Sequence, residues 1–438
     1  MTVDLDEESA DAAATPATPL LEHEPTAPAG GWLLLLAGTL ALVASRLAPL
    51  APLVAWQGDG TRVQATLYRS PLRLLLSPVT STLEGLSLLP APDHIAVVAS
   101  VVLLLVVWGA ARAVPPGATS WRARLCGSLR YACLGWCAIG GVYLTGALVA
   151  WPMAQLRLDS SDELAVDFHS HTLRSHDGRW DFTLERNRAW HQGGGFDVAY
   201  VTDHADSAAV GEWPVEEHAG TILLEGAEFC SDGAHLVRLG RADDPTSVLV
   251  LTTPFPAASM ARLQSTGTQV AGVEVADASP RGLQWLADPP PQLKEAAAMP
   301  SLVPISSSNL HGWGRTVAAW TILHLPGWRV NTPEELDQRI RTVLRSGDRA
   351  DARIILRNSQ RLAAGTHAER ALALPVLAWS VLRTLDDAEV AVWLTWLWAP
   401  TIVSLMLAAF GARQRARAPL VASAGAWVYD VVASSETR

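Results

Sequence analysis

Lysine is almost absent from this sequence. Lys294 is the single lysine among 438 residues, so arginine carries nearly all of the positive charge, and the formal net charge is -10. An acidic chain without a dense basic stripe interleaved with aromatic residues is not expected to bind a nucleic-acid backbone. The composition therefore predicts no nucleic-acid partner.

Cysteine is also scarce, and its positions exclude a disulfide framework. Of the four cysteines, Cys126, Cys133 and Cys137 fall in or beside one apolar stretch, and Cys230 has no obvious partner. A disulfide-stapled fold would need pairable cysteines spread along the chain. We interpret Cys133 and Cys137 as small apolar packing residues on one helix face.

Basic residues are missing from residues 1–30, which are acidic and rich in Ala, Pro and Thr. This composition is typical of disorder, because it offers too little apolar surface to offset the entropy of ordering the chain. A secretory signal peptide would begin with positive charge. We therefore expect a disordered acidic tail that is not a signal peptide.

Four stretches are apolar enough to be membrane helices, at about 27–54, 94–112, 130–151 and 389–411. Each approaches the ~20 residues needed to cross a hydrocarbon core of about 30 Å. Indole rings favour the membrane interface, and tryptophans lie near the expected ends: Trp32, Trp56, Trp108 and Trp151. The sequence predicts three crossings within 31–151 and a fourth at 389–411, the first being interrupted by Arg46.

The arginine distribution favours one orientation. The loop 112–130 carries four arginines and no acid, and the tail 412–438 begins with a run of arginines, which places both in the cytoplasm. Arginines before residue 94 oppose this assignment, so the orientation stays open. We expect an integral protein of a bacterial inner membrane whose large domain, 155–385, lies outside the cytoplasm.

Short strand-like runs alternate with helical patterns in this domain. Strands are predicted over 164–169, 198–204, 221–229, 234–240, 248–253, 270–277 and 302–309. Helices are predicted near 182–192, 207–218, 257–266, 281–298 and 333–346. The last begins with Thr332, Pro333 and Glu335, the pattern of a capping box. Strands interspersed with helices predict an α/β fold with a mostly parallel sheet, open or closed into a barrel.

Metal-ligating residue types recur at the ends of these strands. His169 and His171 are two positions apart, so their imidazoles leave one face of the strand and can converge on one ion. The other residues of this kind are Asp177, His204, Glu228, His235, Asn309 and His311. Because functional side chains of α/β barrels meet at the carboxyl ends of the strands, the recurrence predicts a shared metal site.

These segments resemble the motifs of the PHP (polymerase and histidinol phosphatase) superfamily, in the order of that family. The resemblance begins with Asp-Phe-His-Ser-His at 167–171 and continues with Val-Thr-Asp-His at 201–204 and Gly-Ala-Glu at 226–228. Further similar segments lie at 234–240, 272–275 and 308–314. The resemblance covers roughly 164–316, about a third of the chain, and leaves out the apolar stretches.

The resemblance implies a distorted (β/α)7 barrel, here flanked by transmembrane helices, that holds two or three divalent ions, commonly Zn, Mn or Fe. By position, a first metal would be bound by His169, His171, Glu228 and Asn309. Glu228 would bridge to a second metal with His235, and a third would be bound by Asp177, His204 and His311. Imidazole and carboxylate ligands suit these ions in their own right.

Two positions depart from the family pattern. Asn309 stands where the family has Asp, and Thr253 stands where it has His before proline. Both changes weaken the first and second metal positions. Either the site holds fewer ions, or the domain has kept binding and lost catalysis.

Other polar residues near the motifs have two interpretations each. Arg174, His176 and Arg315 could grip phosphoryl oxygens, Arg with paired hydrogen bonds, or could form ordinary surface ion pairs. Asp167 and Asp203 are expected to orient imidazoles. Histidines outside the motifs are expected to be ordinary surface or core residues: His191, His218, His324 and His367.

Two functions remain open at the level of sequence. The first is hydrolysis of a phosphomonoester or phosphodiester, in a small-molecule or membrane-associated substrate, by metal-activated water. The second is a catalytically degenerate domain that senses a metal or a phosphorylated ligand at the membrane. A transporter is poorly supported, because only Arg46 is a polar residue at mid-membrane depth.

Overall fold

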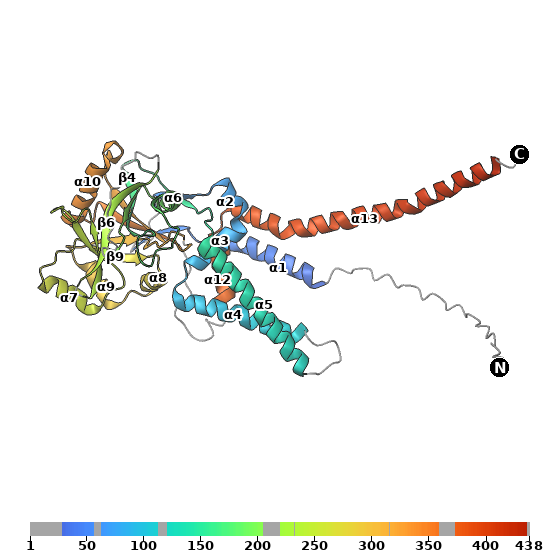
Figure 1. Cartoon of the computed structure of the whole chain (residues 1–438), viewed down its shortest axis with the longest axis horizontal. Helices are drawn as coiled ribbons and strands as arrows, with labels where there is room; N and C mark the ends of the chain where they lie inside the picture. Colours follow the sequence, from blue (N-terminus) through green and yellow to red (C-terminus); the bar gives the residue numbers. More distant parts are fainter. Residues whose placement is uncertain are drawn as a thin grey trace, which may run out of the picture.

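The computed structural model describes residues 29–56, 63–112, 121–204, 220–231, 233–314, 316–358 and 373–435. It comprises a mixed α/β domain from which long apolar helices project (Figure 1). All seven predicted strands are present, with ends that differ by a few residues: β4 (Glu163–Ser170), β5 (Val198–Val201), β6 (Ile222–Ser231), β7 (Ala234–Leu239), β8 (Val248–Leu251), β9 (Gly272–Asp277) and β10 (Val303–Ser307).

Three strands that the sequence pattern did not reveal extend this sheet. They are β11 (Ala319–His324), β12 (Ala352–Arg357) and β1 (Leu53–Ala55), which give the ten-stranded order β1-β12-β11-β4-β5-β6-β7-β8-β9-β10. A separate two-stranded sheet pairs β2 (Ala65–Tyr68) with β3 (Gln155–Leu158). The stretch 27–54 is therefore not one continuous span, because its last residues belong to the domain.

The prediction of a mostly parallel sheet is wrong. Parallel pairing is confined to β4-β5-β6 and β8-β9-β10, and the remaining neighbours in the described sheet are antiparallel. The cause is connection length. Ser231 pairs with Ala234 across a hairpin, whereas a parallel crossover requires about a dozen residues.

The sheet curls into a half-barrel, so the predicted distorted (β/α)7 barrel is confirmed only as a mixed α/β fold with a curved sheet. At one end the two limbs of the curve meet. Asn309 N donates to His169 O at 2.8 Å, and His171 N donates to Leu310 O at 2.8 Å. The segment after β10 is thereby held against the carboxyl end of β4.

Helices connect the strands much as the sequence predicts. They are α6 (Leu184–Gly194), α7 (Ala257–Ser265), α8 (Pro280–Ala287), α9 (Pro291–Ala298), the short 3-10 helix η1 (Trp328–Val330) and α10 (Pro333–Ser346). The predicted helix 281–298 is two helices, because the two prolines at 289 and 290 cannot continue α8. The capping box of α10 is confirmed, with Glu335 N donating to Thr332 Oγ1. The predicted helix 207–218 lies outside the described residues.

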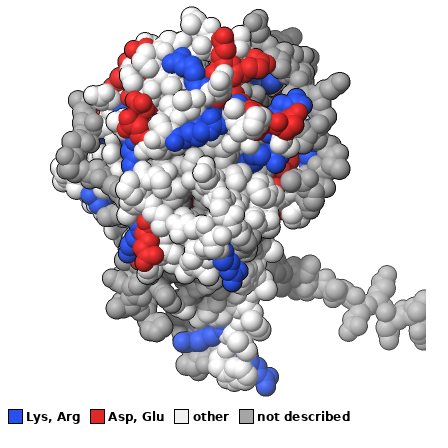
Figure 2. Space-filling model, turned by 90° about the vertical axis from the view of Figure 1, so that its left-hand side faces the viewer, with Lys and Arg blue, Asp and Glu red and all other residues white. Residues whose placement is uncertain are grey.

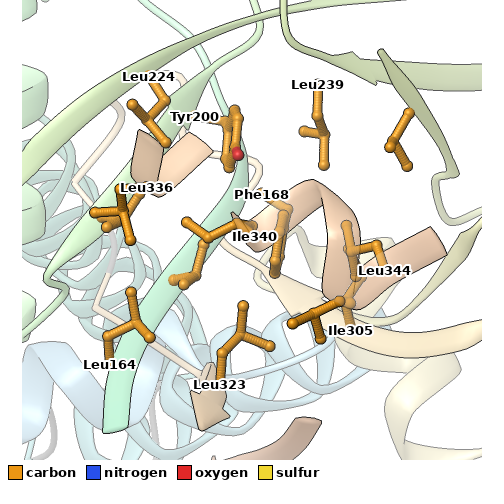
Figure 3. Packing of buried hydrophobic residues seen from close by; sticks show 14 of the residues in the cluster. Leu164, Phe168, Tyr200, Leu224, Leu239, Ile305, Leu323, Leu336, Ile340 and Leu344 are labelled. Atoms are coloured by element: carbon orange, nitrogen blue, oxygen red, sulfur yellow. The ribbon is translucent and has the colours of Figure 1, made fainter. Parts of the chain in front are cut away.

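One face of α10 covers the concave core of the sheet. Leu336, Ile340 and Leu344 recur every four residues and pack among strand side chains that include Leu164 and Phe168 (Figure 3). Each such side chain contributes about 1.5–3 kcal/mol when fully buried. Side chains point to alternate faces of a strand. Because Leu164 and Phe168 point into this core, Asp167 and His169 of β4 point to the opposite face of the sheet.

The remaining helices lie toward the other side of the domain (Figure 1): α1 (Ala29–Ser45), α2 (Pro71–Leu75), α3 (Ser77–Ser87), α4 (Ala91–Arg112), α5 (Trp121–Leu148), α12 (Ala373–Thr384) and α13 (Asp387–Ser435). Within the described residues, three segments are long and apolar enough to cross a membrane: Ala91–Ala111, Arg124–Leu148 and Asp387–Arg413. Only 6% of the apolar windows of α5 and α13 is buried, so the protein itself does not cover them. The first predicted span corresponds to α1, which has 17 residues and is not among these three segments.

A buried ionic cluster joins these helices to the sheet. Glu84 of α3 accepts hydrogen bonds from Arg73 Nη2 at 2.6 Å and from Arg357 Nη2, on β12, at 2.7 Å. Arg73 also pairs with Glu389 of α13 at 2.9 Å. Buried charges are costly unless they are paired, so the cluster ties the positions of α2, α3, α13 and β12 to one another.

The face of the domain turned away from the projecting helices has a mixed surface. Acidic and basic side chains are interspersed there among uncharged residues (Figure 2). The described part of this face therefore carries no broad field of one sign of charge.

Candidate metal centre

Three side chains, from the end of β4, the residue just after it and β6, converge at the centre of the site. His169 Nε2 lies 2.9 Å from His171 Nε2, and each of these atoms lies 3.3 Å from Glu228 Oε2. Ligands bound at 2.0–2.2 Å in a tetrahedral shell lie about 3.3–3.6 Å apart. All three residues are buried, and their donor atoms already have nearly the spacing that one shared ion requires.

A second group adjoins the first. Asp177 reaches both His311 Nε2, at 3.1 Å, and His204 Nε2, at 3.5 Å, through its two carboxylate oxygens. His204 Nδ1 lies 3.5 Å from Glu228 Oε2, so this imidazole connects the two groups. The rings of His171 and His311 stack with centroids 4.1 Å apart. The residues predicted for the third metal are therefore assembled in the structure.

The ligand-type atoms of the site form three overlapping sets that could each hold a metal ion. The sets are His169, His171 and Glu228; His171, His204 and His311; and His176, Asp177 and His204. Sharing of His171 and His204 makes the sets one continuous cluster. The cluster crosses from β4 to β6 and to the loops that follow β4, β5 and β10.

His235 of β7 lies at the edge of this cluster. Its Nδ1 atom is 2.7 Å from Glu228 Oε1, and its side chain is 50% exposed. Its other nitrogen faces Cys230 Sγ at 3.4 Å. Glu228 and His235, predicted to share a second metal, are thus adjacent, although His235 belongs to none of the three sets.

Burial and close opposite charges govern titration in the cluster. Burial alone would lower the pKa of His169, but the carboxylates of Glu228 and Glu274 outweigh it and hold this pKa well above its ordinary value. Burial would raise the pKa of Glu228, yet its imidazole contacts, above all with His169, hold it far below its usual range. Burial lowers the pKa of His311 to about 3. At neutral pH Glu228 is therefore ionised and His311 is neutral, the states in which each can bind a cation.

Glu274 of β9 is a site residue that the sequence interpretation did not assign. It is fully buried, and its Oε1 atom lies 3.3 Å from His169 Nδ1 and accepts from Ser307 Oγ. Its Oε2 atom accepts from Thr253 N at 2.8 Å and Thr253 Oγ1 at 3.1 Å. Glu274 therefore orients His169. Thr253 donates to this carboxylate through both its backbone N–H and its hydroxyl.

Asn309 is held beside the cluster in an unusual backbone conformation. Its φ is 44°, a left-handed value that Asn tolerates better than most residues. Asn309 Nδ2 donates to Asp277 Oδ2 at 3.1 Å, whereas the buried Oδ1 atom has no hydrogen-bond partner. Because the backbone of Asn309 binds His169 O and His311 Nδ1, this unpaired oxygen lies on the segment beside the ligands and is available to a cation.

The two aspartates predicted to orient imidazoles do not contact the ring of a ligand-type histidine directly. Asp203 accepts from Thr172 N, Thr172 Oγ1 and Ser175 Oγ, and Ser175 Oγ contacts His171 Nδ1 at 2.9 Å. Asp167 Oδ1 accepts from the backbone of His169 at 3.3 Å, and Oδ2 contacts His191 Nε2 at 2.7 Å. His191 is a core residue, as predicted, and these contacts hold the end of β4.

The three residues that could grip phosphate differ in their exposure and in their contacts. His176 is exposed, its ring is tilted against that of His204 with centroids 4.6 Å apart, and it belongs to a potential ligand set with Asp177. Arg174 is partly exposed, and its backbone N donates to Thr172 Oγ1. Arg315 lies outside the described residues. The structure thus adds His176 to the possible ligands, and its position one residue before Asp177 was the available signal.

The donor set fits a borderline divalent ion. Six imidazoles, from His169, His171, His176, His204, His235 and His311, surround the carboxylates of Asp177 and Glu228, and mixed nitrogen and oxygen shells of this kind suit Zn, Mn and Fe. Comparison of the chain with protein-family models, curated proteins and solved structures finds no match.

Proposed function

We propose that this protein is a metal-dependent phosphoester hydrolase anchored to a membrane. The observation that carries the proposal is the continuous cluster around buried Glu228, which lies within 3.5 Å of His169, His171, His204 and His235. One carboxylate in contact with four imidazoles would help to hold more than one cation, as in sites where paired ions act on phosphate esters.

The cluster would hold two or three divalent ions, with Zn, Mn and Fe as the chemically suited classes. Such ions, when bound, supply a nucleophilic water near neutral pH and neutralise the charge of the phosphoryl group. In the reaction the water oxygen forms a new bond to phosphorus, the ester P–O bond breaks, and the alcohol leaves with a proton.

The residues of the chain have separate tasks in this reaction. His171, His204 and His311 would supply imidazole nitrogens, while Glu228 and Asp177 balance the positive charge of the site. Glu274 and Asp203 orient His169 and His171 through Nδ1, the latter by way of Ser175. Half-exposed His235 lies at the rim, where it can give a proton to the leaving oxygen.

The test uses the full chain in detergent with p-nitrophenyl phosphate and added Mn or Zn. Wild type is expected to release nitrophenol, and His171→Ala is expected to lose at least about 100-fold in rate, the typical contribution of one group in a metal or acid-base site. His324→Ala is the matched control, because His324 is exposed on β11 and no motif includes it. Equal rates for wild type and His171→Ala would refute the proposal.

A second candidate is a metal-binding membrane sensor without catalysis. Thr253 and Asn309 favour it, because Thr253 is committed to Glu274 and Asn309 brings no charge. Metal content and turnover separate the two functions. Stoichiometric metal with no hydrolysis across a panel of phosphate esters would support the sensor, and hydrolysis that depends on His171 would exclude it.

A further inference from the structure

A cavity of about 520 Å3 lies between the end of α5, α6 and the loop after β10, which carries the ligand-type residue His311. Its walls are mainly apolar and come from three places: the segment Leu148 to Met153, the α6 residues Ala189, Trp190 and Gly193, and the loop around Leu310 and Gly312. Cavities of about 300–1,000 Å3 with apolar walls and few polar groups are typical of ligand sites.

One end of the cavity is continuous with a potential membrane span. The segment Arg124–Leu148 is long and apolar enough to cross a bilayer, and its last residue, Leu148, lines the cavity together with Val149 and Trp151. A tryptophan just beyond a span is typical of the membrane interface. The cavity therefore begins where the hydrocarbon region would end.

The other end of the cavity reaches the loop that carries His311. Leu310 and Gly312, which flank the ligand-type residue His311, both line it. Arg179, two residues after Asp177, donates from its backbone to His311 O at 2.9 Å and from Nη1 to Ala147 O at 3.1 Å and Leu148 O at 3.3 Å. The loops that carry Asp177 and His311 thus rest on the carboxyl end of α5.

A glycine makes this contact possible. Gly314 has a φ of 24°, and a Cβ at this position would collide with Gly146 O of α5. The loop after β10 therefore approaches the helix backbone directly, and no side chain separates the end of the potential span from the residues that follow His311.

The charged residues of the cavity favour an anion. Arg179 and Arg186 line it with a single carboxylate, Asp181, which contacts both guanidinium groups. Two cations and one anion leave a net charge of +1 on the described lining. Arginine beside an apolar wall suits a ligand with a phosphate group and a hydrocarbon chain.

We propose that the cavity receives the hydrocarbon chain of an amphipathic phosphate ester, which enters from the bilayer and places its phosphate at the His, Asp and Glu cluster. This inference rests on the proposed hydrolase function and names its substrate class. Hydrolysis would break the ester P–O bond, return the long-chain alcohol to the bilayer and release inorganic phosphate to water.

The experiment uses dodecyl phosphate with a diazirine near the end of its chain, added to the full chain in phosphatidylcholine nanodiscs. After illumination, labelled peptides are mapped by mass spectrometry. Label is expected on 148–153 and 186–193, and excess unlabelled dodecyl phosphate is expected to remove it. Inorganic phosphate and dodecyltrimethylammonium, which each lack one half of the recognised structure, are expected to leave it.

Gly193→Leu is the blocking variant, and Gly141→Leu is its control. A Cβ at Gly193 would meet Met153 Cε at 3.5 Å, so the leucine side chain enters the cavity, whereas a Cβ at Gly141 of α5 meets no atom within 4 Å. Displacing two methylenes of a bound chain weakens binding on the order of tenfold. Labelling is expected to fall by that factor only in Gly193→Leu.

Two results would overturn the inference: label spread over α4, α5 and α13 that Gly193→Leu does not change, or equal competition by dodecyl phosphate and dodecyltrimethylammonium. Hydrolysis of p-nitrophenyl phosphate by the wild-type chain reports separately on the proposed function. A chain that hydrolyses this compound but takes no label in the cavity refutes only the substrate class. A chain labelled in the cavity that hydrolyses no phosphate ester refutes the hydrolase, and still supports alkyl phosphate binding.

Discussion

Glu274→Gln is expected to weaken metal binding without removing any ligand. Each oxygen of Glu274 serves one N–H group: Oε1 faces His169 Nδ1 at 3.3 Å and Oε2 accepts from Thr253 N at 2.8 Å. The two hydroxyl partners, Ser307 and Thr253, can rotate, but a backbone N–H cannot. An amide has one oxygen, so glutamine can accept from only one of these N–H groups.

The metal-free variant can avoid this conflict. If His169 changes tautomer, Nδ1 accepts from the glutamine amide and Nε2–H donates toward Glu228. A metal bound to Nε2 prevents this change of tautomer, because the proton of His169 must then be on Nδ1. That Nδ1–H group has no acceptor in the variant. A buried unsatisfied donor costs about 1–3 kcal/mol, so affinity should fall about 5- to 150-fold, in line with the 10- to 100-fold typical of residues that orient ligands.

The assay is competition for Zn between the full chain and a fluorescent chelator. Glu225→Gln is the matched control, because Glu225 is three positions before Glu228 on β6 and its side chain leaves the opposite face. Thermal unfolding without metal verifies that both variants fold. An affinity of Glu274→Gln within about threefold of wild type, smaller than the loss of one hydrogen bond predicts, would contradict the orienting role of Glu274.

Two further predictions concern stability. Glu84→Gln leaves Arg357 buried without its carboxylate and Arg73 with Glu389 alone, and should lower the free energy of unfolding at pH 7 by about 3–5 kcal/mol, seen as a lower urea midpoint. Burial raises the pKa of Glu84, but Arg357 and Arg73 hold it below its ordinary 4.5. The difference in unfolding free energy between wild type and Glu84→Gln should therefore be complete above pH 4.5 and shrink as the pH falls below it. A difference that grows in acid would contradict this. Asn309→Asp replaces the donor that lies 3.1 Å from Asp277 Oδ2 with a second carboxylate, so the metal-free protein should melt at a lower temperature and added Zn should stabilise it more than wild type. An unchanged melting temperature in the presence of a chelator would show that Asp277 does not depend on this amide.

The local sequence determined much of the fold and many of the ligand-type residues. Apolar runs of a few residues between turn residues predicted all seven strands from β4 to β10, and Thr332, Pro333 and Glu335 predicted the start of α10. These features depend on side chains close together in the chain, so one segment is enough to identify them. The pairing of His169 and His171 could likewise be predicted from one short segment, because side chains two residues apart on a strand point to the same face.

Other features depended on contacts between distant segments. The strands β1, β11 and β12 join the sheet by antiparallel pairing across tens to hundreds of residues, and nothing in their local sequence specifies that partner. Glu274 orients His169 from 105 positions away, and Glu84 reaches Arg357 across 273 positions.

The sequence by itself thus determined which residues could bind a metal, since ligand chemistry is a property of each side chain. Only the tertiary structure decided which of them meet, that Thr253 is committed to Glu274, and that the loops carrying Asp177 and His311 rest on the end of an apolar helix. Those outcomes depend on the curvature of the sheet and on the packing of the loop after β10 against α5, and both are set by the whole chain.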